Sequence, residues 1–130
     1  MTYELRNTPD LGFPIHYTGH LHDDLSLRTL YSAADALVVP SRQEAFGQTA
    51  SEAQTCGTPV VAFDIAGLPD IVEHQRTGYL AQAFETEDLA TGIRWVLGKD
   101  VRHASRERAV ARFSTHIVAE QYLSVYQNLI

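Results

Sequence analysis

The chain has 130 residues, 45% of them hydrophobic, and a formal net charge of −6 at pH 7. This length gives one ordinary domain with a sizeable core and is too short for two. The acidic balance argues against nucleic acid or an anionic membrane as a partner, because either would favour a basic surface. One cysteine cannot form an internal disulfide, and there is no leader and no bilayer-length apolar run, so we expect a cytoplasmic protein.

The first third of the chain reads as strand, helix, strand. Residues 15–18 form a short strand that Gly19 ends, and Asp23 or Asp24 then caps a helix. The apolar residues of this helix recur at helical spacing and are predicted to be buried: Leu27, Leu30, Tyr31 and Ala34. Residues 36–40 form an apolar run without alternation, which is typical of a strand covered on both faces in a parallel sheet.

The middle of the chain continues this alternation. A loop over residues 41–47 leads into a short helix, which Gly57 closes from the position after its last turn. Residues 60–63 are predicted to be a second buried strand, Asp70 caps a short helical turn, and residues 78–80 form a minor strand.

The remainder is predicted to be helical. One helix has an apolar stripe of Leu89, Ile93, Val96 and Leu97, with Gly98 as its stop signal. Two more helices follow, and the last is predicted to bury Val118, Tyr122, Val125, Tyr126 and Leu129. Strands that alternate with helices predict an α/β fold: a Rossmann-like parallel sheet with helices on both faces, followed by C-terminal helices. Ligands of such sheets bind at the carboxyl ends of the strands.

The segment with the clearest chemistry is PSRQEAFGQTASEA at residues 40–53, followed by GTPVV at residues 57–61. Two carboxylates flank a glycine-containing loop that follows a strand and opens a helix. The free amides of Gly47, Gln48 and Thr49 are therefore predicted to form an anion site with the positive end of the helix dipole behind them. Gly47 also lets a ligand approach the backbone closely.

This pattern, with Glu44 and Glu52 separated by seven residues, resembles the signature of family 4 glycosyltransferases. Similar motifs occur at residues 17–19, 30–35, 67–70, 77–80 and 113–114, so the resemblance is recognisable from about residue 13 to residue 130. It implies that residues 1–130 form a single, partial nucleotide-sugar-binding domain. This domain would be part of the C-terminal domain of a GT-B enzyme, in which two Rossmann-like domains face a cleft.

The resemblance also implies residue roles. Glu44, the catalytic position, would accept hydrogen bonds from hydroxyls of the donor sugar, and Glu52 would accept both ribose hydroxyls. The other donor-binding positions are the amides of Phe46 and Gly47 at the sugar, those of Gln48 and Thr49 at the diphosphate, Ser41 and Arg42 at the strand end, and Gly19 and His20 near the base.

The same resemblance implies a UDP- or GDP-sugar as donor, a glycan or lipid-linked molecule as acceptor, and transfer with retention. Front-face attack, in which amides and cationic side chains stabilise the leaving group, needs neither a metal nor a cofactor. An N-terminal acceptor domain, absent from this sequence, would complete the enzyme and place it at the inner face of the membrane.

Simpler readings compete with these roles. Thr49 and Glu52 fit a capping box, and Glu44 taken alone is an ordinary solvated loop acid. His20 and His22 precede two Asp residues, but Asp is the usual helix cap and two histidines fall short of a metal site. The second hypothesis for the whole chain is a non-catalytic nucleotide or nucleotide-sugar binding module. A flavodoxin-like receiver would need an acidic cluster and a lysine at the strand ends, and is discounted.

Full-length family members carry a basic pair and two further βα units before residue 15. Arg42 is the nearest substitute cation, the arginines at 102–112 are predicted to lie on a solvated face, and we expect the chain alone to be inactive. In the strand order 3-2-1-4-5-6 the missing strands would fall between residues 15–18 and 37–39. Either these two strands pair directly, or a second copy of the chain covers the exposed, adhesive sheet edge.

Overall fold

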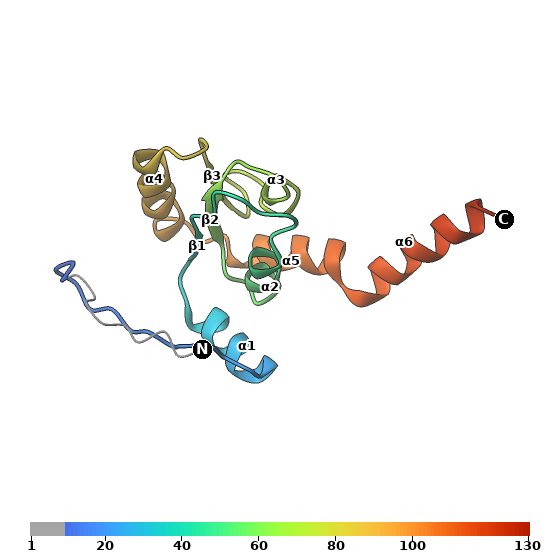
Figure 1. The fold of residues 1–130 in the computed structure, drawn as a ribbon, viewed down its shortest axis with the longest axis horizontal. Coiled ribbons are helices and arrows are strands. Elements are labelled where there is room, and N and C mark those ends of the chain that lie inside the picture. The colour runs from blue at the N-terminus through green and yellow to red at the C-terminus, as the bar shows by residue number, and fades with distance from the viewer. Residues whose placement is uncertain (1–9) are drawn as a thin grey trace.

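The computed structural model describes residues 10–130, which form three strands and six helices; strands and helices alternate as far as the fourth helix, and two more helices follow. The strands are β1 (Leu37–Val39), β2 (Val60–Phe63) and β3 (Gly78–Ala81). The helices are α1 (Asp24–Ala33), α2 (Gln48–Thr55), α3 (Leu68–Ile71), α4 (Thr86–Leu97), α5 (Arg102–Phe113) and α6 (Thr115–Asn128). The predicted α/β, Rossmann-like fold is confirmed (Figure 1).

The three strands form one parallel sheet in the order β1-β2-β3. In the centre of the sheet Val61 of β2 is paired with Val38 on one side and with Tyr79 on the other. Because the strands run in the same direction, their carboxyl ends meet at one edge of the sheet. The loops that follow β1 and β2 therefore start side by side.

Alternate residues of β2 point into two separate cores. Val60 and Ala62 pack in a cluster that includes Ala50 and Ala53 of α2, whereas Val61 packs on the other face with apolar residues of β3 and α4. Figure 1 shows α4 on the opposite side of the sheet from α2. Both faces of the sheet are therefore covered by helices, as predicted.

The helix ends agree with their sequence signals, except at α3. Asp23 caps α1 by accepting a 2.7 Å hydrogen bond from the amide of Ser26. Gly57 follows α2 with a φ of +80°, which a glycine adopts without strain. The prediction that Asp70 caps α3 is wrong: the helix begins at Leu68 after Gly67, because Pro69 fits best in the first helical turn.

The predicted strand at residues 15–18 is wrong. Residues 10–23 contain neither helix nor strand, and Ile15 and Tyr17 are exposed. A strand needs a neighbour to accept and donate its backbone hydrogen bonds, and within residues 10–130 none lies beside this segment. Direct pairing with β1 therefore does not occur, and β1 is paired only with β2. Val38 is 36% exposed, so the predicted cover on both faces of β1 is incomplete.

The predicted burial of α6 is also wrong. Val118 is half-buried, but the other four residues of the predicted stripe are exposed: Tyr122, Val125, Tyr126 and Leu129. Their helical spacing is real, yet α6 packs against α5 near its start and then leads away from the rest of the molecule (Figure 1). Leu30 of α1 and Leu97 of α4 are likewise exposed. None of the helices within residues 10–130 is long and apolar enough to cross a membrane.

Candidate functional site

The loop after β1 presents a row of free amides at the start of α2. Gly47 is the N-cap, with a left-handed φ of +90°, and Ala50 donates to its carbonyl at 3.0 Å. Within residues 10–130 the amides of Gly47, Gln48 and Thr49 have no acceptor. Unpaired donors at the positive end of an eight-residue helix have the geometry that suits an anion such as phosphate.

The loop is held in place by the loop that follows β2. A Cβ atom at Gly67 would lie 2.5 Å from the carbonyl oxygen of Ala45 and 2.7 Å from that of Phe46. A Cβ atom at Gly47 would lie 2.9 Å from Cδ2 of Leu68, in α3. The two strand-end loops are thus in close contact, and two glycines make this contact possible.

The other predicted residues of this loop have varied surroundings. Glu44 is half-buried, with its Cγ 3.7 Å from the position that a Cβ of Gly47 would take, and within residues 10–130 its carboxylate has no hydrogen-bond partner. Ser41 is half-buried just beyond β1. Arg42 is exposed, with its guanidinium 4.6 Å from the ring centre of Phe84. The exposed ring of Phe46 packs edge-on against Phe113 at 5.7 Å.

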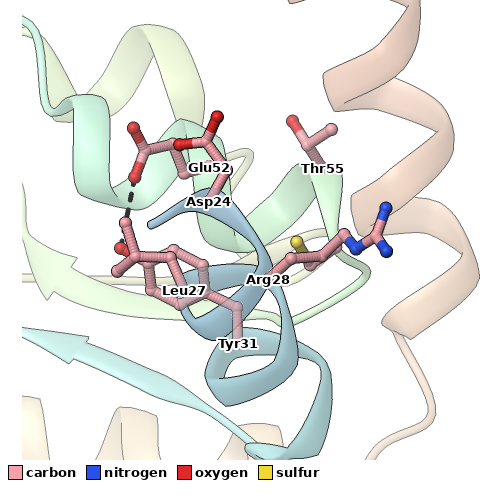
Figure 2. Close-up of a pocket in the computed structure, with 7 residues that line it drawn as sticks. Asp24, Leu27, Arg28, Tyr31, Glu52 and Thr55 are labelled. Carbon is pink, nitrogen blue, oxygen red and sulfur yellow. Dashed lines mark hydrogen bonds between the residues drawn. The ribbon is translucent and has the colours of Figure 1, made fainter. Parts of the chain in front are cut away.

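Glu52 lies one turn into α2, and a donor fixes each of its oxygens. The side-chain amide of Gln48 donates to Oε1 at 3.1 Å. The hydroxyl of Tyr31 donates to Oε2 at 3.3 Å, as Figure 2 shows. Since a carboxylate has about four lone-pair sites, two remain for a ligand. The capping-box reading is wrong, because the N-cap is Gly47 rather than Thr49 and no side-chain hydrogen bond caps the helix.

A hollow of about 290 Å³ adjoins Glu52 between α1 and α2. Its walls are the side chains of Asp24, Leu27, Arg28, Tyr31, Glu52, Thr55 and Cys56 (Figure 2). Burial, and next the charge of Glu52, raise the pKa of the Tyr31 hydroxyl, which therefore stays protonated as a donor. Sequence analysis assigned no site role to Tyr31, because only the packing of α1 on α2 brings it to Glu52.

Gly19 and His20 lie in the segment before α1, where both are exposed. No hydrogen bond joins them to residues 40–52. The His20 ring packs edge-on against that of His22, with ring centres 4.5 Å apart. Across residues 10–130 no group of three side chains that could ligate a metal lies together.

The sequence predicted that the arginines of α5 lie on a solvated face. In the structure, three of them also bind backbone carbonyls of other helices. Arg102 donates to the carbonyls of Ser32 and Ala34 at 2.9 and 2.8 Å, and Arg106 donates to the carbonyl of Thr55. Arg112 in the same way donates to the carbonyl of Asp70. One helix therefore satisfies carbonyls at the ends of α1, α2 and α3, the three helices that surround the site.

Comparison with known proteins gives a consistent result. Residues 10–112 match the family described as "Glycosyl transferases group 1". Among curated proteins, the chain is 47% identical over 103 residues to the D-inositol 3-phosphate glycosyltransferase of Mycobacteroides abscessus, and 42% identical over 106 residues to that of Saccharomonospora viridis. These matches cover 77% and 78% of this chain but 23% and 24% of the relatives, so the chain spans about a quarter of their length.

Solved structures agree with the sequence relatives. Sucrose-phosphate synthase from Thermosynechococcus elongatus matches with a TM-score of 0.71 and 36% identity, covering 80% of this chain and 27% of that one. TarM from S. aureus, in complex with Fondaparinux, alpha-GlcNAc-glycerol and UDP, matches with a TM-score of 0.69 and 26% identity. That match covers 78% of this chain and 22% of TarM.

Proposed function

Since the chain belongs to the glycosyl transferases group 1 family, we propose that residues 40–52 hold the nucleotide-sugar donor of a retaining, family 4 type transferase. The observation that carries the proposal is the geometry of α2. Its free amides at Gln48 and Thr49 suit the diphosphate, and the oriented carboxylate of Glu52 suits the ribose hydroxyls one turn further on. Along α2 the amides come first and Glu52 follows, and in a nucleoside diphosphate the ribose likewise follows the diphosphate.

Glu44 completes the proposed site on the sugar side. Its carboxylate is free of protein partners within residues 10–130 and borders Gly47, so it can accept hydrogen bonds from sugar hydroxyls. The Phe46 and Gly47 amides serve the same sugar. As the bond to the diphosphate breaks, the amides of Gln48 and Thr49 stabilise the charge that develops on the leaving group. Arg42 supplies the nearest cation, and Ser41, Gly19 and His20 complete the donor side of the site.

We propose UDP as the first nucleotide to test, because TarM was solved with UDP. D-inositol 3-phosphate is the acceptor named for the curated relatives, and it takes precedence over a glycan or lipid-linked acceptor. The same proposal includes further protein segments that bind the acceptor. These segments would place the enzyme at the inner face of a membrane. The exposed edge of β1 is a proposed site of self-association, which sedimentation over a range of concentrations measures.

Isothermal titration with UDP and a UDP-sugar tests the two carboxylates. Glu44→Gln is expected to weaken the UDP-sugar about tenfold and to leave UDP unchanged, because its partner is the sugar. Glu52→Gln is expected to weaken both ligands by about tenfold or more, because both contain ribose. Glu87→Gln, at an exposed site on α4, is the matched control.

The result that rejects the proposal is unchanged affinity for both ligands in both site variants. A transfer assay with D-inositol 3-phosphate, run on a protein in which the chain is joined to the proposed acceptor-binding segments, then separates an enzyme from the alternative, a non-catalytic nucleotide-binding module. Binding of the nucleotide-sugar without any release of UDP, in the presence of the acceptor, favours the module.

A further inference from the structure

Tyr31, which donates a hydrogen bond to Glu52, is itself firmly packed. It is only 8% exposed and belongs to the apolar cluster on the α2 face of the sheet. Its own carbonyl accepts a hydrogen bond from the buried hydroxyl of Thr58, so its backbone is held as well. The ring crosses from α1 toward α2, and its hydroxyl reaches the Glu52 carboxylate beside the hollow (Figure 2).

The two donors to Glu52 differ in freedom. Gln48 is exposed at the first position of α2, so its side chain can rotate away into solvent. Tyr31 is packed on most sides, and its ring has few alternative rotamers. The direction of the carboxylate is therefore set mainly from the Tyr31 side. A carboxylate that is held in one direction can engage a pair of hydroxyls at lower entropic cost than a free one.

We propose that Tyr31 is a positioning residue that aims Glu52 at the ribose diol and thereby sets the preference of the site for ribonucleotides over deoxyribonucleotides. This inference rests on the proposed function, since it takes Glu52 as the ribose ligand. Tyr31 touches Glu52 rather than the nucleotide. Its loss reduces affinity through the hydroxyl groups of the sugar and leaves the contacts of the diphosphate with the α2 amides intact.

The test compares the dissociation constants of UDP and 2′,3′-dideoxy-UDP for the full chain. The wild type is expected to prefer UDP. Tyr31→Phe keeps the packed ring and removes the hydroxyl, and it is expected to reduce this preference by about threefold to tenfold, the size of one typical hydrogen bond. Adding Tyr31→Phe to Glu52→Gln is expected to cause no further reduction, because the two residues act as one unit.

Tyr79→Phe is the matched control, since it removes another hydroxyl that donates to a carboxylate, that of Asp88 at 2.8 Å, in the core around α4. It is expected to leave the preference unchanged. A merely structural role of Tyr31 would weaken both nucleotides equally, and that result overturns the inference. A wild type that binds UDP no better than 2′,3′-dideoxy-UDP rejects the ribose role of Glu52 itself, and so the proposed function.

Discussion

Replacing Gly67 with alanine tests the contact that positions the loop of residues 41–47, which leads to the free amides at the start of α2. Gly67 has a φ of −80°, which alanine adopts freely, so the substitution adds no backbone strain. Its Cβ would lie 2.5 Å from the Ala45 carbonyl oxygen, whereas ordinary contact begins at 3.4 Å. The loop must therefore retreat by about 0.9 Å, since both sides of the contact are backbone. Such overpacking costs about 1–3 kcal/mol of unfolding free energy, or roughly 4–12 °C in Tm for this chain length.

The same displacement should weaken ligand binding, because the displaced residues Ala45 and Phe46 directly precede Gly47 and Gln48, whose amides are proposed to bind the ligand. We expect Gly67→Ala to weaken pyrophosphate and UDP by about tenfold at a temperature where the protein is folded. Gly98→Ala is the control, since its Cβ would lie 3.5 Å from the nearest atom, in ordinary contact. Thermal unfolding and isothermal titration measure the two effects. A Gly67→Ala variant with the wild-type Tm and affinity would refute the argument.

Three further predictions concern the anion site, the α5 arginines and pH. Pyrophosphate should shift the backbone amide resonances of residues 47–49 most strongly, because these donors are free. Arg106→Met should lower the unfolding free energy by about 1–2 kcal/mol, because the carbonyl of Thr55 at the end of α2 loses its donor. Asp88→Asn should destabilise the protein at neutral pH but not in acid. The hydrogen bond from the Gln82 amide lowers the pKa of Asp88 below 3.8, so its contribution is present above that pH and is lost as the pH falls through the folded pKa.

Each of these predictions has its own check. Resonance shifts confined to the arginines at 102–112 would contradict the anion site. Arg94→Met, at an exposed position of α4, should change Tm by less than Arg106→Met, and equal effects would count against the α5 contact. Urea unfolding from about pH 7 to pH 2 tests Asp88: a stability difference between Asp88→Asn and the wild type that stays constant over this range is the contrary result.

Much of the fold was predictable because its signals are local. The strands at residues 60–63 and 78–80, the cap at Asp23 or Asp24 and the stop at Gly57 each depend on a few neighbouring residues. All agree with the structure, in which Asp23 is the cap. The free amides at the start of α2 belong to the same class, since a glycine loop that opens a helix leaves them unpaired wherever it occurs.

The errors occur where a local pattern needs a distant partner. Residues 15–18 have the composition of a strand, but a strand exists only beside another strand. The apolar stripe of α6 has helical spacing, and the helix forms, but spacing cannot say whether any surface covers the stripe.

The sequence alone determined the α/β class, the order of the elements from residue 24 onward and the two carboxylates that flank the glycine loop, because periodicity, caps and glycines act over a few residues. Only the tertiary structure decided what holds these groups in place. The Tyr31–Glu52 hydrogen bond joins residues 21 positions apart, and the Arg102–Ala34 bond joins residues 68 positions apart. Such contacts depend on how whole helices pack across the sheet, and no local pattern encodes which side chain will face which carbonyl.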